Sequence, residues 1–261
     1  MSPKRPIVLC FSGHDPSGGA GIQADIEAIA SHRCHAASII TSLTEQDSRN
    51  VKKLMPQKVE NIISQFETLR KDFKFDAIKI GLIGHPDIAL ALCEILMTCP
   101  NIPVVLDPVL ASGGGTELAG KPLIDIITEQ LLPLTTILTP NSHEARKLAN
   151  EDDLAECGQI LQTKGADYVL ITGTHEDSEL VHNRLYMPNK LNETFNWERL
   201  PHSYHGSGCT LASTIAALLA QGLDVFTAAN EAQEYTWQAL AAAYQPGHGQ
   251  HNPNRLFWMD A

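Results

Sequence analysis

The sequence predicts a single α/β domain built on a mostly parallel sheet. Short apolar runs alternate with helix-length segments along most of the chain, and this alternation implies right-handed crossovers between parallel strands. The 261 residues suffice for one large domain with a sizeable core. Neither a linker nor a low-complexity stretch divides the chain, so we expect residues 1–261 to form one domain.

Each expected element follows from its apolar pattern. Six apolar runs indicate buried strands, at residues 7–11, 37–41, 77–80, 104–106, 136–138 and 168–171. The segments between them indicate helices, at 21–32, 56–71, 86–97, 121–131 and 154–164. A hairpin of residues 179–187 and 194–200 is expected next. Two alanine-rich helices, 207–221 and 225–244, complete the pattern and are expected to pack on the sheet.

The charge balance limits the possible partners. Nineteen Lys and Arg against thirty Asp and Glu leave a net charge of −11. Nucleic acids and anionic membranes require clustered cations, so neither is an expected partner. An anionic substrate must therefore be bound by local features such as helix N-termini.

Cysteine usage and hydropathy indicate a cytoplasmic protein. The six cysteines, at 10, 34, 93, 99, 157 and 209, form no C-x-x-C pair and show no framework spacing. The apolar run at residues 7–11 is too short for a signal peptide, and no run approaches the ~18 residues of a membrane span.

Candidate functional residues concentrate in loops that follow strands, where ligands of open α/β sheets bind. The first loop, residues 12–21, is rich in glycine and opens a helix, but it matches neither a dinucleotide fingerprint nor a P-loop. Close approach of its backbone to a ligand is one interpretation, and a simple connecting turn is the other. One helical turn later, Asp25 either points back toward the loop or faces solvent. The other unusual loops are 44–50, 107–116 and 202–209.

Two further segments place oxygen ligands near this edge of the sheet. Asp107 follows an expected strand, and a Ser-Gly-Gly-Gly loop at 112–115 comes soon after it. Asn141 and Glu144 begin another helix, and their spacing of three puts amide and carboxylate on one face. Such oxygens can hold Mg²⁺, directly or through water. The same spacing is also that of a helix capping box.

The segment from His205 to Thr210 is the strongest local signal. Free amides of Gly206, Ser207 and Gly208 at a helix start can bind an anion. Cys209 lies in the first turn, where the positive end of the helix is expected to lower its pKa. Two alternatives are a small buried Cys209 and a thiol-hydrolase pair of Cys209 with His205. No third orienting group supports the pair.

Together, five motifs resemble the hydroxymethylpyrimidine and phosphomethylpyrimidine kinases of thiamine biosynthesis, in the ribokinase-like superfamily. They occur in the family's order between about residue 7 and about residue 222, and the first and last found together are highly specific. The motifs are Ser12 to Asp25, Lys79-Ile80-Gly81, Asp107-Pro108-Val109, Thr139-Pro140-Asn141-x-x-Glu144 and His205-Gly206-Ser207-Gly208-Cys209-Thr210.

The resemblance implies a three-layer α/β/α sandwich that uses MgATP to phosphorylate 4-amino-5-hydroxymethyl-2-methylpyrimidine and then its monophosphate. It also implies a homodimer. By the same analogy, Asp25 and Gln46 hydrogen-bond the pyrimidine, and Cys209 is the catalytic residue. The remaining implied roles are pyrimidine contacts for Gly13, Gly81 and Val109, nucleotide and phosphate contacts for Asp107, Asn141 and Thr172, metal ligation for Glu144 and Asp107, and an anion hole of Gly206, Ser207 and Gly208.

The chain departs from the family pattern in two places. The family often has Lys-Gly-Gly where this chain has Thr172-Gly173-Thr174, and a lysine often follows the Asp-Pro-Val segment where this chain has Ala111-Ser112-Gly113. The second phosphorylation is therefore expected to be slower than the first. Pyridoxal kinase and a non-enzymatic pyrimidine sensor are the rival interpretations. The pairing of Asp25 with Gln46 favours an aminopyrimidine over pyridoxal.

Overall fold

The computed structural model describes residues 5–259, and these form a nine-stranded sheet in the order β3-β2-β1-β4-β5-β6-β7-β8-β9. Neighbouring strands from β2 to β7 run parallel, while β3, β8 and β9 add antiparallel edges. The strands are β1 (Ile7–His14), β2 (His35–Gln46), β3 (Val51–Pro56), β4 (Ala77–Ile80), β5 (Val104–Leu106), β6 (Ile137–Leu138), β7 (Tyr168–Ile171), β8 (Leu180–Tyr186) and β9 (Glu193–Glu198).

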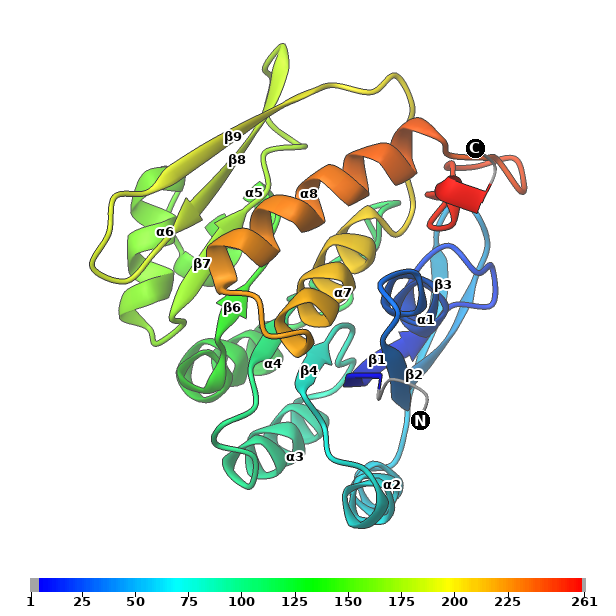
Figure 1. Ribbon diagram of the computed structural model, residues 1–261, viewed down its shortest axis with the longest axis vertical. Coiled ribbons are helices and arrows are strands. Elements are labelled where there is room, and N and C mark those ends of the chain that lie inside the picture. The colour runs from blue at the N-terminus through cyan, green and yellow to red at the C-terminus, as the bar shows by residue number, and fades with distance from the viewer. Residues whose placement is uncertain (1–4, 260–261) are drawn as a thin grey trace.

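Helices cover both faces of the sheet, which makes the three layers of the predicted sandwich (Figure 1). On one face pack α1 (Gly21–Ser31), α7 (Ser207–Ala220) and α8 (Val225–Ala241). On the other face pack α2 (Val59–Asp72), α3 (Pro86–Met97), α4 (Lys121–Ile126), α5 (Ser142–Ala149) and α6 (Leu154–Thr163). The predicted fold class is confirmed.

Strand β1 shows why the core has two halves. Val8 and Cys10 pack toward α1 and α7, whereas Leu9 and Phe11 pack toward α2 and α3, and all four are fully buried. A parallel strand that is covered by helices on both faces has a continuous apolar sequence. This is why the apolar run at residues 7–11 predicts a buried strand.

The predicted boundaries were wrong around β2 and β3. Residues 44–46 continue β2 instead of beginning a loop, because Thr44 pairs with Leu54 and Gln46 with Val51 in an antiparallel ribbon. Strand β3 was missed because exposed lysines at 52 and 53 hide its pattern, as charges on an edge strand commonly do. As a result, α2 begins at Val59 and not at Pro56.

One other segment differs from expectation. The helix expected at 121–131 is α4 followed by one π-helical turn (Ile127–Leu131) and a 3-10 turn (Leu132–Leu134). After α8, the chain turns back beside the end of that helix and lies near α1 (Figure 1). There the indole of Trp258 donates to the hydroxyl of Ser31. Within residues 5–259, no helix has the length and apolar content needed to cross a membrane.

Candidate active site

The glycine loop, residues 15–21, is organised by the buried carboxylate of Asp15. This carboxylate accepts hydrogen bonds from the amide of Ser17 (2.8 Å), the hydroxyl of Ser17 (2.7 Å) and the amide of Ala20 (2.8 Å). His205 Nε2 lies 2.8 Å from it. Burial raises the pKa of Asp15, but these bonds from His205 and Ser17 outweigh burial and leave the pKa lowered. Asp15 thus joins the first motif to the last one.

Beneath the loop lies a fully buried ion pair between Asp25 of α1 and Lys79 of β4. Asp25 Oδ1 accepts from Lys79 Nζ (2.8 Å) and from the hydroxyl of Ser213 on α7 (2.6 Å). Lys79 Nζ also donates to Ser12 Oγ (3.0 Å). A Cβ on Gly81 would lie 2.5 Å from Lys79 Nζ, so the absence of a side chain there makes room for the ammonium group.

Asp25 therefore points into the protein, and the solvent-facing interpretation was wrong. Its second oxygen, Oδ2, is buried and has no hydrogen-bond partner within the described chain. Burial lowers the pKa of Lys79, but the nearby Asp25, Cys209 and Asp107 outweigh burial and raise it, so the lysine is a cation. Asp25 thus has a role in holding this cation, and its contact with a pyrimidine stays a prediction.

Cys209, in the first turn of α7, lies beside Asp107 at the end of β5. The thiol is half-buried and close enough to the Asp107 carboxylate to act on it: burial raises the pKa of Asp107, while Lys79 and the Cys209 thiol act in the opposite direction. The expected lowering of the Cys209 pKa was wrong. Burial raises it to about 12, helped by the charges of Asp107 and Asp25, while Lys79 and the amide of Gly21 act in the opposite direction. Desolvation and two carboxylates outweigh the helix dipole.

The turn before α7 has the shape expected of an anion hole. Gly206 is the N-cap with φ +89°, a left-handed conformation that favours glycine. The amides of Ser207, Gly208 and Cys209 follow it and have no carbonyl one turn earlier to bond. Asp107 faces the same turn, because a Cβ on Gly208 would lie 3.8 Å from Asp107 Oδ1.

Asn141 and Glu144 form the capping box of α5. Asn141 Oδ1 accepts from the Glu144 amide (2.9 Å), and Glu144 Oε2 accepts from the Asn141 amide (3.0 Å). Glu144 Oε1 accepts from the amide of Leu110 (3.2 Å). Burial, reinforced by Asp107, raises the pKa of Glu144 to about 8. Thr172, just after β7, bridges to Asn141, so two of the three predicted nucleotide and phosphate contacts are neighbours.

Gln46 lines a closed cavity between the end of β2 and the loop that follows Asp107. The space admits no water-sized sphere. Ser112 Oγ and Asn50 Oδ1 are 2.6 Å apart, and Thr116 Oγ1 donates to the carbonyl of Val51 (3.2 Å), so the 112–116 loop is hydrogen-bonded down onto the β2–β3 turn. Among the residues lining this cavity are Gln46, Asn50, Val51, Ser112, Gly113, Gly114, His205 and Gln250.

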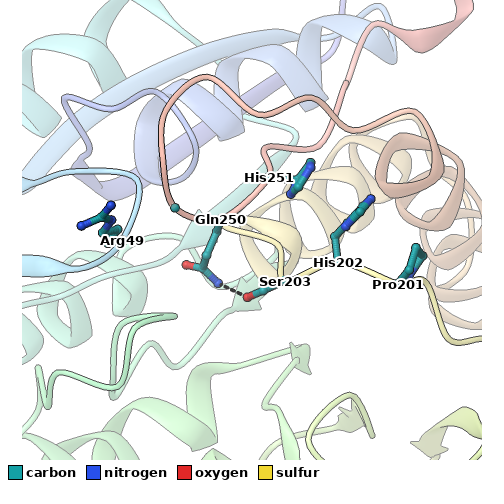
Figure 2. Close-up of a pocket in the computed structure, with 7 residues that line it drawn as sticks. Arg49, Pro201, His202, Ser203, Gln250 and His251 are labelled. Carbon is teal, nitrogen blue, oxygen red and sulfur yellow. Dashed lines mark hydrogen bonds between the residues drawn. The ribbon is translucent and has the colours of Figure 1, made fainter.

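Next to it is an open hollow of about 410 Å³, which shares Arg49 and Gln250 with the closed cavity (Figure 2). The rings of His202 and His251 stack there, 4.1 Å apart between centroids. Gln250 Nε2 donates to Ser203 Oγ (2.8 Å), and Gln250 lines both the hollow and the closed cavity. A ligand entering from this side must displace Gln250 or the 112–116 loop.

The structure brings most of the predicted site residues to one edge of the sheet. Gly13 lies where β1 approaches this edge, and its backbone oxygen would be 2.3 Å from a Cβ on Gly21. Val109, half-buried, follows Asp107 in the loop. In the described part of the chain, no three His, Cys, Asp or Glu side chains are grouped as metal ligands. The sequence interpretation missed Asp15, the pairing of Lys79 with Asp25, and a buried Arg255 behind the anion hole. A lysine inside the apolar run 77–80 was the available signal, because buried lysines are almost always paired.

Comparison with known proteins identifies the family of this site. The family model described as phosphomethylpyrimidine kinase matches residues 15–254. The chain belongs to that family. A hydroxymethylpyrimidine/phosphomethylpyrimidine kinase of Synechococcus elongatus is 33% identical over 252 residues, which cover 94% of this chain and 95% of that protein.

Solved structures agree with this assignment to the phosphomethylpyrimidine kinase family. The enzyme from Clostridium difficile 630 superposes with a TM-score of 0.79 at 30% identity, over 91% of this chain and 100% of its own. An ADP complex of Bacillus subtilis pyridoxal kinase superposes with a TM-score of 0.90 at 28% identity, over 97% of this chain and 98% of its own. The resemblance seen in the sequence is confirmed: the chain is a small-molecule kinase of thiamine biosynthesis with the ribokinase-like fold.

Proposed function

We propose that this protein transfers the γ-phosphoryl group of ATP to the alcohol of 4-amino-5-hydroxymethyl-2-methylpyrimidine, and then transfers a second group to the monophosphate. The observation that carries the proposal is a cluster formed where β5 ends and α7 begins: Asp107, Cys209 and the Gly206 turn. An anion site, a carboxylate and a thiol meet there, within the family whose motifs supply them. We expect the enzyme to act in the cytoplasm as a homodimer. Light scattering of the purified protein tests the homodimer by measuring its molar mass.

In the proposed reaction, the hydroxyl oxygen of the pyrimidine attacks the γ-phosphorus, and the bond from phosphorus to the departing ADP oxygen breaks. The amides of Ser207, Gly208 and Cys209 stabilise the charge on the moving phosphoryl group. The proton of the hydroxyl passes to Cys209 Sγ. Because the resting group is a thiol, it must first lose its own proton to solvent, and Lys79 is the cation that favours the resulting thiolate.

The donor set fits the magnesium ion that the resemblance implies. Asp107 Oδ2 is a buried carboxylate oxygen with no hydrogen-bond partner in the described chain, and hard oxygens are the ligands of Mg²⁺. Asp107 would hold the ion, with Glu144 acting through a bound water because both of its own oxygens already accept backbone amides. Bound there, Mg²⁺ supplies charge neutralisation at the phosphates.

Glu144→Gln is expected to weaken the response of the activity to Mg²⁺, because a neutral amide is a poorer partner for the ion or its water. A Mg²⁺ titration of initial rates in the variant and in wild type measures the shift. Glu156→Gln is the matched control, since it makes the same carboxylate-to-amide change in the first turn of another helix, α6, at an exposed position. Superimposable titrations of Glu144→Gln and wild type would leave Glu144 with the capping role alone.

Gln46→Ala is expected to raise the KM for the pyrimidine far more than the KM for ATP. The side chain lines the closed cavity, and an unpaired polar group in a site built on hydrogen bonds costs about 1 to 3 kcal/mol. Initial rates with each substrate varied in turn give both constants. Gln57→Ala is the control, because Gln57 follows β3 at the opposite end of the β2–β3 ribbon from Gln46. Equal KM values for Gln46→Ala and wild type would remove this residue from the pyrimidine site.

Pyridoxal phosphorylation is the second candidate activity. The TM-score of 0.90 to a pyridoxal kinase favours it, since the two folds superpose over nearly their whole lengths. The pyrimidine remains the better candidate because Gln46 in the cavity and Asp25 beneath the loop provide hydrogen-bonding groups that an aminopyrimidine uses.

Phosphorus NMR of the purified protein with MgATP and the hydroxymethylpyrimidine tests the proposal. A monophosphate signal is expected first, followed more slowly by a diphosphate. ATP consumption without a pyrimidine phosphate, or no consumption at all, would contradict the proposed reaction.

A further inference from the structure

We infer that Arg255 is a positioning residue, which fixes the anion hole (residues 206–209) against the glycine loop (residues 15–21). The inference rests on the proposed function of that site. Arg255 lies in the segment after α8, one residue beyond the stretch that the family model matches. Its side chain is 1% exposed, and the described contacts of its guanidinium group all reach α1, the glycine loop or the start of α7.

The guanidinium bonds directly to both halves of the site. Nη2 donates to the carbonyl of Gly19 in the glycine loop (2.5 Å) and lies 3.5 Å from the carbonyl of Gly206. Nε donates to the hydroxyl of Thr210 in α7 (2.8 Å), and Nη1 donates to Glu27 of α1 (2.9 Å). One rigid, planar group thus connects two helices and the two loops that precede them.

Arg255 contributes to the direction of an anion-hole donor, directly and through Thr210. The Gly206 carbonyl accepts from the amide of Thr210 (3.0 Å) and from its hydroxyl (2.8 Å). Arg255 Nε donates to that same hydroxyl, so the arginine, the threonine and the carbonyl form one connected group. In a trans peptide the C=O and the following N–H point in opposite directions, so the Ser207 N–H is held away from Arg255. The loops meet closely here, because a Cβ on Gly206 would lie 1.9 Å from the Gly19 oxygen.

Arg255 is itself held rigidly. Tyr235 on α8 donates its hydroxyl to the Arg255 carbonyl (2.5 Å), and the chain just before it pairs with Tyr244 through Asn252. Glu27 balances the positive charge of Arg255, but the Glu27 side chain is partly exposed. Loss of the arginine therefore leaves no buried anion without a partner. A lysine at this position would keep the positive charge, but it could not reproduce the planar set of N–H donors that the guanidinium group presents.

Arg255→Met is expected to lower kcat for pyrimidine phosphorylation by roughly 10- to 100-fold with little change in either KM, because misplacement of the donors by a fraction of an ångström affects the transition state most. Arg255→Lys is expected to fall between Met and wild type. Trp258→Ala is the matched control, since Trp258 belongs to the same segment but bonds to Ser31 away from the site. Its kcat should equal that of wild type.

Hydrogen exchange provides a readout that does not depend on turnover. In Arg255→Met, peptides covering 16–22 and 205–211 should both exchange faster, while peptides of β4 and β5 should not. A protein that phosphorylates no pyrimidine would refute the proposed function and still permit this exchange test. Wild-type exchange at both segments, or wild-type kcat in a folded Arg255→Met or Arg255→Lys protein, would overturn the inference.

Discussion

Lys79→Met is expected to lower the free energy of unfolding by about 3 to 5 kcal/mol, because removing one partner of a buried pair leaves the other charge uncompensated. Lys79 and Asp25 are both 0% exposed, and Nζ lies 2.8 Å from Oδ1. Urea unfolding followed by far-UV circular dichroism measures the loss. The double variant Lys79→Met/Asp25→Asn should recover much of it, since no unpaired carboxylate then remains.

The matched control is a lysine–aspartate pair of the same length on the surface. Lys121 Nζ also lies 2.8 Å from Asp125 Oδ1, but these side chains are 84% and 44% exposed. Lys121→Met is therefore expected to leave the urea midpoint almost unchanged. Equal losses in the Lys79 and Lys121 variants would contradict a buried ion pair beneath the glycine loop.

Cys209→Ala is expected to lower kcat by roughly 10² to 10⁴, the range for loss of a general base, with little change in either KM. Because burial raises the pKa of this thiol to about 12, its thiolate fraction rises with pH throughout the neutral range. The kcat/KM of wild type for the pyrimidine should therefore rise between pH 7 and pH 9, and that of Cys209→Ala should lack this rise.

Two variants separate the thiol chemistry from packing. Cys209→Ser keeps the size and a hydroxyl but not the thiol, so it is expected to be nearly as slow as Cys209→Ala. Cys99→Ala removes a partly exposed cysteine at the far end of α3 and should behave as wild type. A folded Cys209→Ala enzyme with wild-type kcat would show that the anion hole carries the catalysis and that the thiol only packs.

The position of the site could be predicted from the sequence because parallel strands end at the same edge of a sheet. Asp107 and the Gly206 turn are about a hundred residues apart in the sequence. Asp107 follows β5 and the Gly206 turn precedes α7, and both elements have a clear apolar pattern. Both motifs lie in loops of the kind that bind ligands in open α/β sheets, and the resemblance to the kinase family assigns both to one site.

The electrostatics of the site could not be predicted in the same way. The sequence predicted a lowered pKa for Cys209 because the start of a helix, and with it the positive end of the helix dipole, can be located from local sequence. Burial and the charges of Asp107 and Asp25 depend on three-dimensional neighbours, and they reverse the shift. The pairing of Asp25 with Lys79 across 54 residues was hidden for the same reason.

The C-terminal segment shows a further limit of the sequence interpretation. Residues 245–255 carry no strong periodicity, yet within them Gln250 lines the closed cavity and the buried Arg255 bonds to the glycine loop and to α7. Arginine side chains are typically solvated, so the sequence gives no sign that this one is buried. Its burial follows from contacts with α1 and the glycine loop that only the structure shows.

A competition assay tests the central claim most directly. Equimolar hydroxymethylpyrimidine and pyridoxal are mixed with limiting MgATP, and the ratio of the two phosphorylated products gives the ratio of their kcat/KM values. A pyrimidine kinase yields mainly the pyrimidine phosphate, and Gln46→Ala should move the ratio toward pyridoxal phosphate. Mainly pyridoxal phosphate from the wild-type protein would contradict the account.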